Sequence, residues 1–212
     1  MTLQNAKKYP KCQSIENDGR RDKTHRDIHE KPKRINKKKF TNDKMNITIT
    51  GFSGTGKTTI SRLLARKLDK KLVSTDEEIL KRTRLTPQKF VKKYGWDKLR
   101  ETESETIENI SDLDDFVLDA GSGIILRNEN IINLKKNGLI VFLTADLKTL
   151  ANRKIQEKDD FTKSNYIDKI KGFLSQCEDK YKKVADYTID TSNLSPEEAC
   201  DLIMHYVQLE LQ

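Results

Sequence analysis

From Met45 onward, short apolar runs alternate along the chain with longer segments that carry apolar residues at helical spacing. The short runs are rich in β-branched and aromatic residues and predict strands over Asn46–Thr50, Lys71–Ser74, Asp115–Leu118, Gly138–Leu143 and Tyr187–Asp190. The intervening segments predict helices over 58–68, 97–110, 146–155 and 164–183, and two more that start after Thr86 and Ser195. This alternation is typical of an α/β fold in three layers, with an approximately five-stranded parallel sheet between helices.

Residues 1–44 differ from the rest of the chain in composition. Their few apolar residues follow neither helical nor strand spacing, so they cannot offset the roughly 1–2 kcal/mol per residue that chain ordering costs. They hold 14 Lys and Arg against 6 Asp and Glu, a net charge of +8, whereas residues 45–212 hold 27 of each. We therefore expect a disordered basic extension over 1–44 and one folded domain over 45–212. The extension is either simply solvated or able to bind nucleic acid through 31–39.

Composition excludes several classes of protein. Hydrophobic residues make up 34% and charged residues 35% of the chain. No apolar run approaches the length of a membrane-spanning helix, and the first 30 residues lack the apolar core of a secretory signal. Three scattered cysteines, Cys12, Cys177 and Cys200, exclude a disulfide framework and a cysteine metal cluster. We expect a monomer in the cytoplasm.

The segment from Gly51 to Thr58 matches the phosphate-binding pattern G-x-x-x-x-G-K-[ST] and lies between a predicted strand and a predicted helix. Its glycines allow backbone N–H groups to point at phosphate oxygens, and the helix presents its positive end to the same anion. Lys57 would reach the β- and γ-phosphates, and Thr58 would bind Mg²⁺. The residues expected to bind ATP are Gly51, Ser53, Gly54, Thr55, Gly56, Lys57, Thr58 and Thr59.

A second metal-binding residue is expected at Asp119. It follows the apolar run Phe116–Leu118, and an apolar strand that ends in aspartate is the form of a Walker B motif. The Asn-Lys-x-Asp motif with which small GTPases read guanine is absent from the sequence. Together these features favour a small phosphoryl-transfer kinase that uses ATP and Mg²⁺.

Several segments, in this order, resemble the shikimate kinase family of P-loop kinases. Besides the phosphate loop they are Thr75–Ile79, Leu99–Glu103, Gly121–Leu126, Tyr181–Asp186 and Ser195–Glu198. The resemblance implies the P-loop kinase fold and ATP-dependent phosphorylation of a hydroxyl of shikimate, a small carboxylate, in aromatic amino acid biosynthesis.

The resemblance also implies residue roles. Asp76 would accept the hydrogen bond, and then the proton, of the attacking hydroxyl, while Lys57 contacts the phosphates. Arg100 would bind the substrate carboxylate, and Glu103 would orient Arg100. The remaining contacts would be Gly121, Ser122 and Gly123 to substrate, and Arg153 near adenine. Two alternatives remain: Asp76 caps a helix, or Arg100 and Glu103 form an exposed pair worth a few tenths of a kcal/mol.

The chain departs from the family pattern at four places. Ser74 replaces an aspartate near the metal, Ser122 replaces a glycine, the lid segment 156–163 lacks arginine, and Cys177 replaces a second carboxylate-binding arginine. The missing charge-assisted pair could weaken binding of shikimate. Two alternatives follow: a kinase of another small acceptor, such as a nucleoside monophosphate, and a nucleotide-binding pseudokinase whose basic extension binds nucleic acid.

Overall fold

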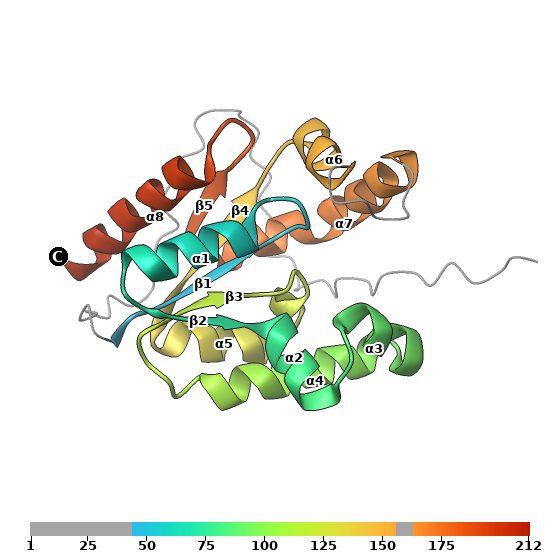
Figure 1. Cartoon of the computed structure of the whole chain (residues 1–212), viewed down its shortest axis with the longest axis horizontal. Helices are drawn as coiled ribbons and strands as arrows, with labels where there is room; N and C mark the ends of the chain where they lie inside the picture. The colour runs from blue at the N-terminus through green and yellow to red at the C-terminus, as the bar shows by residue number, and fades with distance from the viewer. Residues whose placement is uncertain (1–43, 156–162) are drawn as a thin grey trace, which may run out of the picture.

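The computed structural model describes residues 44–155 and 163–212 (Figure 1). The predicted basic extension, apart from Lys44, and most of the predicted lid segment lie outside the described residues.

The centre of the fold is a parallel sheet of five strands in the order β2-β3-β1-β4-β5. The strands are β1 Asn46–Gly51, β2 Lys71–Ser74, β3 Phe116–Asp119, β4 Gly138–Thr144 and β5 Tyr187–Asp190. The predicted α/β class and parallel sheet are confirmed. One strand is displaced from the prediction by one residue, because Asp115 has a positive φ of 65° and ends the preceding turn. Asp119 is consequently the last residue of β3 and pairs with Ser74.

Helices cover both faces of the sheet (Figure 1). The helices α1 (Lys57–Lys67) and α8 (Pro196–Leu211) pack on one face, where Ile60, Leu64 and Ile203 are buried. The helices α4 (Trp96–Ile110), α5 (Asn128–Lys136) and α7 (Lys163–Val184) cover the other face. Both predicted N-caps are present: Thr86 caps α3 (Pro87–Tyr94), and Ser195 with Glu198 forms a capping box on α8.

Three short elements were not predicted from the sequence: the helix α2 (Thr75–Thr83), the 3₁₀ turn η2 (Ile124–Leu126) and the helix α5. The helix α2 follows β2 directly, and η2 leads into α5. The helix α6 (Leu147–Ile155) was predicted and packs against α7. The helices α2, α3 and α4 share a small apolar cluster of their own, built on Ile79, Phe90 and Leu99. This acceptor module lies beside the carboxyl ends of β2 and β3 (Figure 1).

The order of the strands determines where a ligand can bind. The chain leaves β1 for β2 and β3 on one side and then returns to β4 and β5 on the other. Connections that diverge from neighbouring strands leave a crevice at their carboxyl ends, where open α/β sheets bind ligands. The phosphate loop follows β1 and therefore lies in this crevice.

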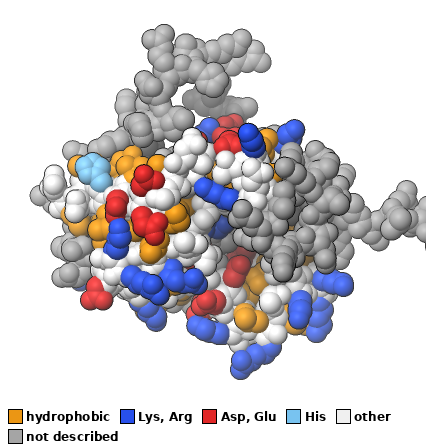
Figure 2. Space-filling view, turned by 45° about the horizontal axis from the view of Figure 1, so that its top comes forward, with side chains coloured by type: hydrophobic (Ala, Val, Ile, Leu, Met, Phe, Trp, Pro, Cys, Tyr) orange, Lys and Arg blue, Asp and Glu red, His pale blue; other side chains and the backbone are white. Residues whose placement is uncertain are grey.

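None of the described helices combines the length and apolar character needed to cross a membrane. On the face of the molecule shown in Figure 2, the described basic and acidic side chains are interspersed. This mixture agrees with the balanced charge of residues 45–212.

Close contact between β1 and β4 generates a stability prediction. A Cβ at Gly138 would lie 2.6 Å from the backbone oxygen of Asn46, so Gly138→Ala must push the two strands apart. We expect a loss of about 1–3 kcal/mol in the free energy of unfolding. The matched control is Gly172→Ala, in α7, where a Cβ meets no atom of the described part of the chain within 4 Å. That substitution should be neutral or stabilise by up to about 1 kcal/mol. Urea denaturation measures both, and equal effects would contradict the prediction.

Candidate active site

The phosphate loop requires glycine at its two ends. Gly51 has a φ of 151°, and a Cβ there would lie 2.2 Å from the backbone oxygen of Leu143. Gly56 has a φ of 88° and is the N-cap of α1, and no side chain among the described residues caps the helix there. The first N–H groups of α1 lack a carbonyl partner within the helix, and the positive end of the helix dipole lies at the same point, which suits an anion.

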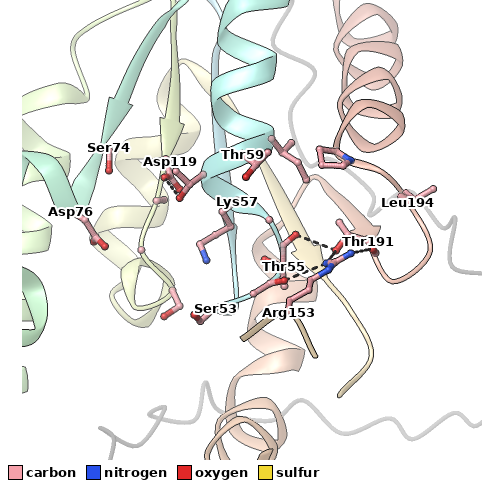
Figure 3. Close-up of a pocket in the computed structure, with 18 of the residues that line it drawn as sticks. Ser53, Thr55, Lys57, Thr59, Ser74, Asp76, Asp119, Arg153, Thr191 and Leu194 are labelled. Carbon is pink, nitrogen blue, oxygen red and sulfur yellow. Dashed lines mark hydrogen bonds between the residues drawn. The ribbon is translucent and has the colours of Figure 1, made fainter. Parts of the chain in front are cut away.

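The backbone oxygens of the loop are held by protein groups. Phe52 O accepts hydrogen bonds from Thr55 Oγ1 at 2.8 Å and from Lys57 Nζ at 2.9 Å. Gly54 O accepts a hydrogen bond from Arg153 at 3.3 Å. Predicted as a residue near adenine, Arg153 thus lies against the loop and also donates two hydrogen bonds to Thr191 (Figure 3).

A cavity of about 660 Å³ opens over the loop at the carboxyl edge of the sheet. Nearly all of the residues predicted to bind nucleotide line it, as do Asp76, Asp119, Gly121 and Ser122 (Figure 3). Its other lining residues, which were not predicted, are Ile60, Ser74, Gln88, Ala120, Thr191, Leu194, Ser195 and Pro196. The nucleotide-side and acceptor-side predictions therefore meet in one pocket.

The two residues predicted to bind metal are in contact. Thr58 Oγ1 donates a hydrogen bond of 2.7 Å to Asp119 Oδ2. Hydroxyl and carboxylate oxygens are the ligand types that Mg²⁺ prefers. Ser74, at the position of the family's aspartate, instead accepts a hydrogen bond from Glu77 N and caps α2. Since Ser74 is the cap, the alternative that Asp76 caps a helix is wrong.

Arg100 and Glu103 are buried, with side-chain exposures of 10% and 5%, and their charged groups are 2.5 Å apart. The alternative that they form an exposed pair is wrong. The guanidinium also lies 5.1 Å from the centre of the Trp96 ring, in a cation–π contact. Its Nε makes no hydrogen bond to any described residue. A buried N–H without a partner is costly, so this edge of Arg100 is suited to an anionic ligand.

The segment 121–123 lies between Arg100 and Asp76. A Cβ at Gly121 would lie 3.5 Å from both Asp76 Oδ1 and Glu103 Oε1, which is ordinary contact. A Cβ at Gly123 would lie 1.5 Å from Arg100 Nη1. Gly123 and Arg100 do not line the cavity over the loop, but Gly121 and Ser122 connect them to it.

Burial changes the proton affinities of two carboxyl groups. Asp76 as a whole is exposed to solvent, yet its carboxyl group faces the pocket. Desolvation, and then the neighbouring charge of Asp119, raise the pKa of Asp76 above its ordinary value, while Lys57 and Arg100 act in the opposite direction. Desolvation also raises the pKa of Glu103, against the influence of Arg100. A raised pKa makes Asp76 a stronger base than an ordinary aspartate.

The side chain of Tyr181 connects the phosphate loop to the acceptor side. Tyr181 stacks on Phe142 at 4.4 Å and meets Phe52 of the phosphate loop edge-on at 5.1 Å. Its hydroxyl donates a hydrogen bond to Ser122 O. Cys177 is fully buried in the same apolar cluster and does not line the cavity. The position of the family's second arginine is thus part of the core.

The comparison with known proteins decides the family. The shikimate kinase profile matches residues 53–208. Over 164 residues the chain is 38% identical to the shikimate kinase of Caldicellulosiruptor bescii, a match that covers 75% of this chain and 93% of that protein. The chain belongs to the shikimate kinase family. The shikimate kinase of Caldicellulosiruptor saccharolyticus is similar as well, with 40% identity over 163 residues, 75% of this chain and 93% of that protein.

Solved structures of shikimate kinases share the fold. The enzyme from Acinetobacter baumannii, described in complex with shikimate, is 29% identical and superposes with a TM-score of 0.68 over 79% of this chain and 93% of its own. The shikimate kinase from Bacteroides thetaiotaomicron, at 22% identity, has a TM-score of 0.71 over 77% and 98%. The predicted family, the P-loop kinase fold and the ATP-dependent kinase activity are confirmed.

Sequence reasoning missed two threonines at the edge of this shikimate kinase pocket. Thr75 Oγ1 accepts a hydrogen bond of 2.9 Å from Gly121 N, which joins the start of α2 to the segment 121–123. Thr191 contacts the phosphate loop from the end of β5. Each directly follows a predicted strand, Lys71–Ser74 or Tyr187–Asp190, and that placement was the available signal.

The raised pKa of Asp76 generates a prediction about stability and pH. A group whose pKa is raised by folding stabilises the folded protein below its unfolded pKa, here near 3.8, and loses that contribution as the pH rises through the folded pKa. At pH 7 the ionised carboxylate is therefore destabilising, and Asp76→Asn should melt at a higher temperature than the parent protein. Below about pH 4 the difference should vanish, because Asp76 is then neutral. Thermal melts without nucleotide test this, and a lower melting temperature of Asp76→Asn at pH 7 would contradict it.

Proposed function

We propose that this protein transfers the γ-phosphoryl group of ATP to a hydroxyl group of shikimate, and that the residues described above perform the transfer. The observation that carries the proposal is the position of a buried arginine beside the pocket of the phosphate loop, with an N–H that no group in residues 44–155 or 163–212 accepts. The pocket itself suits phosphate, and the Arg100 guanidinium beside it suits a small carboxylate. The similar enzyme from Acinetobacter baumannii is described in complex with shikimate, which supports this choice of acceptor.

The nucleotide half supplies positioning and charge. The N–H groups at the start of α1 and the Lys57 ammonium surround the β- and γ-phosphates, whose charge they offset. Lys57 Nζ contacts Phe52 O, so its side chain already lies along the loop. The base lies toward Arg153 and the segment 194–196, which line the far end of the cavity.

The metal half of the proposal concerns Mg²⁺. Thr58 and Asp119 would hold the ion, because their oxygens are in contact and both line the pocket. When bound, Mg²⁺ neutralises part of the phosphate charge. Because Ser74 stands where the family has an aspartate, Asp119 is the carboxylate that would bind the ion together with Thr58.

On the acceptor side, the Arg100 guanidinium binds the substrate carboxylate, and Glu103 and Trp96 hold Arg100 in place. Asp76 accepts a hydrogen bond from the reacting hydroxyl. The hydroxyl oxygen forms a bond to the γ-phosphorus as the bond to the ADP oxygen breaks, and the proton passes to Asp76. Because transfer needs alignment more than covalent help, rigid placement of these groups is the main contribution of the protein.

The activity is tested directly with purified full-length protein. Incubation with Mg²⁺, ATP and shikimate should yield ADP and shikimate 3-phosphate, detected by mass spectrometry. Lys57→Ala should lower kcat by at least about 100-fold, since it removes a charge that stabilises the transition state. A panel of nucleoside monophosphates serves as the control for the alternative acceptor. Turnover of one of these, with none for shikimate, would overturn the proposal.

The role of Arg100 is tested at Gly123. In Gly123→Ala the new methyl group occupies the position of the guanidinium, so Arg100 must move, and the affinity for shikimate should fall by roughly 10- to 100-fold. The control is Gly172→Ala, whose new methyl group meets no described atom within 4 Å and which does not line the pocket, so its affinity for shikimate should be unchanged. Trp96, the single tryptophan of the chain, contacts Arg100, so its fluorescence reports binding without turnover. Equal affinities of the two variants would argue against Arg100 as the carboxylate anchor.

A further inference from the structure

The loop that binds phosphate is held from behind by a residue of a different strand. Thr191 follows β5, is almost fully buried, and donates a hydrogen bond through Oγ1 to Thr55 O at 3.1 Å. It lies 136 residues from Thr55 in the sequence. In Figure 3, Thr191 and Arg153 lie on one side of Thr55, and Lys57 lies on the other.

The direction of this hydrogen bond matters for the chemistry of the loop. The carbonyl and N–H of a trans peptide unit point in opposite directions. A partner that holds Thr55 O on the Thr191 side therefore directs the N–H of Gly56 to the opposite side, where Lys57 lies. Arg153 holds the preceding oxygen, Gly54 O, while the N–H of that peptide unit, on Thr55, donates to Phe52 O. The loop thus keeps these oxygens toward protein, and the hydrogen bond from Thr191 directs the N–H of Gly56 toward phosphate.

Thr191 is itself fixed by its surroundings. Its N–H donates to Thr144 O at 2.8 Å. Arg153 donates through Nη1 to Thr191 Oγ1 at 3.0 Å and through Nη2 to Thr191 O at 2.6 Å. Thr144 O also lies 3.1 Å from Thr191 Oγ1 and competes for its single hydroxyl proton. Arg153 donates to Thr191 Oγ1 and so does not compete for the hydroxyl proton, which faces the two backbone oxygens, Thr55 O and Thr144 O.

We infer that Thr191 is a positioning residue that orients the phosphate loop for the β-phosphate and links it to the segment that lines the base end of the pocket. Three residues beyond Thr191 the chain reaches Leu194, which lines the cavity together with Ser195 and Pro196. The same residue thus joins both ends of the nucleotide site. This inference rests on the proposed use of ATP.

The inference is tested by comparing ADP with AMP, because AMP lacks the β-phosphate. Thr191→Val keeps the shape of the side chain but removes the hydroxyl. Its affinity for ADP, measured by calorimetry with Mg²⁺ and full-length protein, should fall by roughly three- to tenfold, the effect of one hydrogen bond. Its affinity for AMP should change by less than about twofold. Thr191→Ser, which keeps the hydroxyl, should restore ADP binding.

Thr50→Val is the matched control. Thr50 is also buried at the end of a strand, and its hydroxyl makes no hydrogen bond to a described residue. This variant should bind ADP as the parent protein does. If Thr191→Val does not fold, Thr191→Cys, which resembles Thr191→Ser in shape but is a much weaker donor, replaces it and is compared with Thr191→Ser.

Two results would overturn the inference: unchanged ADP affinity in the variant without the hydroxyl, or equal losses for ADP and AMP, which indicate a purely structural role. Failure of the parent protein to bind ADP would instead overturn the proposed function together with this inference. The two failures are therefore distinguishable.

Discussion

A peptide chain that binds phosphate through its backbone must turn several N–H groups to one side and find partners for the oxygens on the other. In this protein the loop after β1 meets that constraint with the carbonyl oxygens of Phe52, Gly54 and Thr55, each of which accepts a hydrogen bond from a protein donor. The donors come from α1, α6 and the end of β5. The fold brings α1, α6 and the end of β5 together around the phosphate loop.

The parallel sheet makes this meeting possible. All five strands end at the same edge, and the strand order places β3 and β4 on either side of β1. Asp119 at the end of β3 therefore reaches Thr58 at the start of α1. The segment 121–123 continues from β3 toward the acceptor module, which brings Gly123 against Arg100. The phosphate loop and the proposed metal and carboxylate sites are thus neighbours because the strands that precede them are neighbours.

Much of this arrangement could be predicted from the sequence, because its signals are local. The phosphate loop and the cap at Ser195 depend on residues within a few positions of one another, and both are present. The helix α2 was missed because its N-cap, Ser74, is also the last residue of β2, so no turn separates strand from helix. The helix α5 was missed because its N-cap position holds Arg127 and not one of the usual capping residues. Thr191 could not be assigned from spacing, since its partner in the loop is far away in the sequence. Cys177 marked a difference from the family, but only the structure shows that it is part of the core.

The helices α2, α3 and α4 have an apolar cluster of their own, separate from the two clusters that flank the sheet. The helix α4 also contributes Ile107 and Ile110 to the cluster that contains Phe52 of the phosphate loop, so this one helix ties the acceptor side to the nucleotide side. Ile79, Phe90 and Leu99 do not line the cavity over the loop, and they can act on a bound acceptor only through the placement of the helices, above all of α4, which carries Arg100. The fold therefore gives the two substrates of the reaction a common mechanical support.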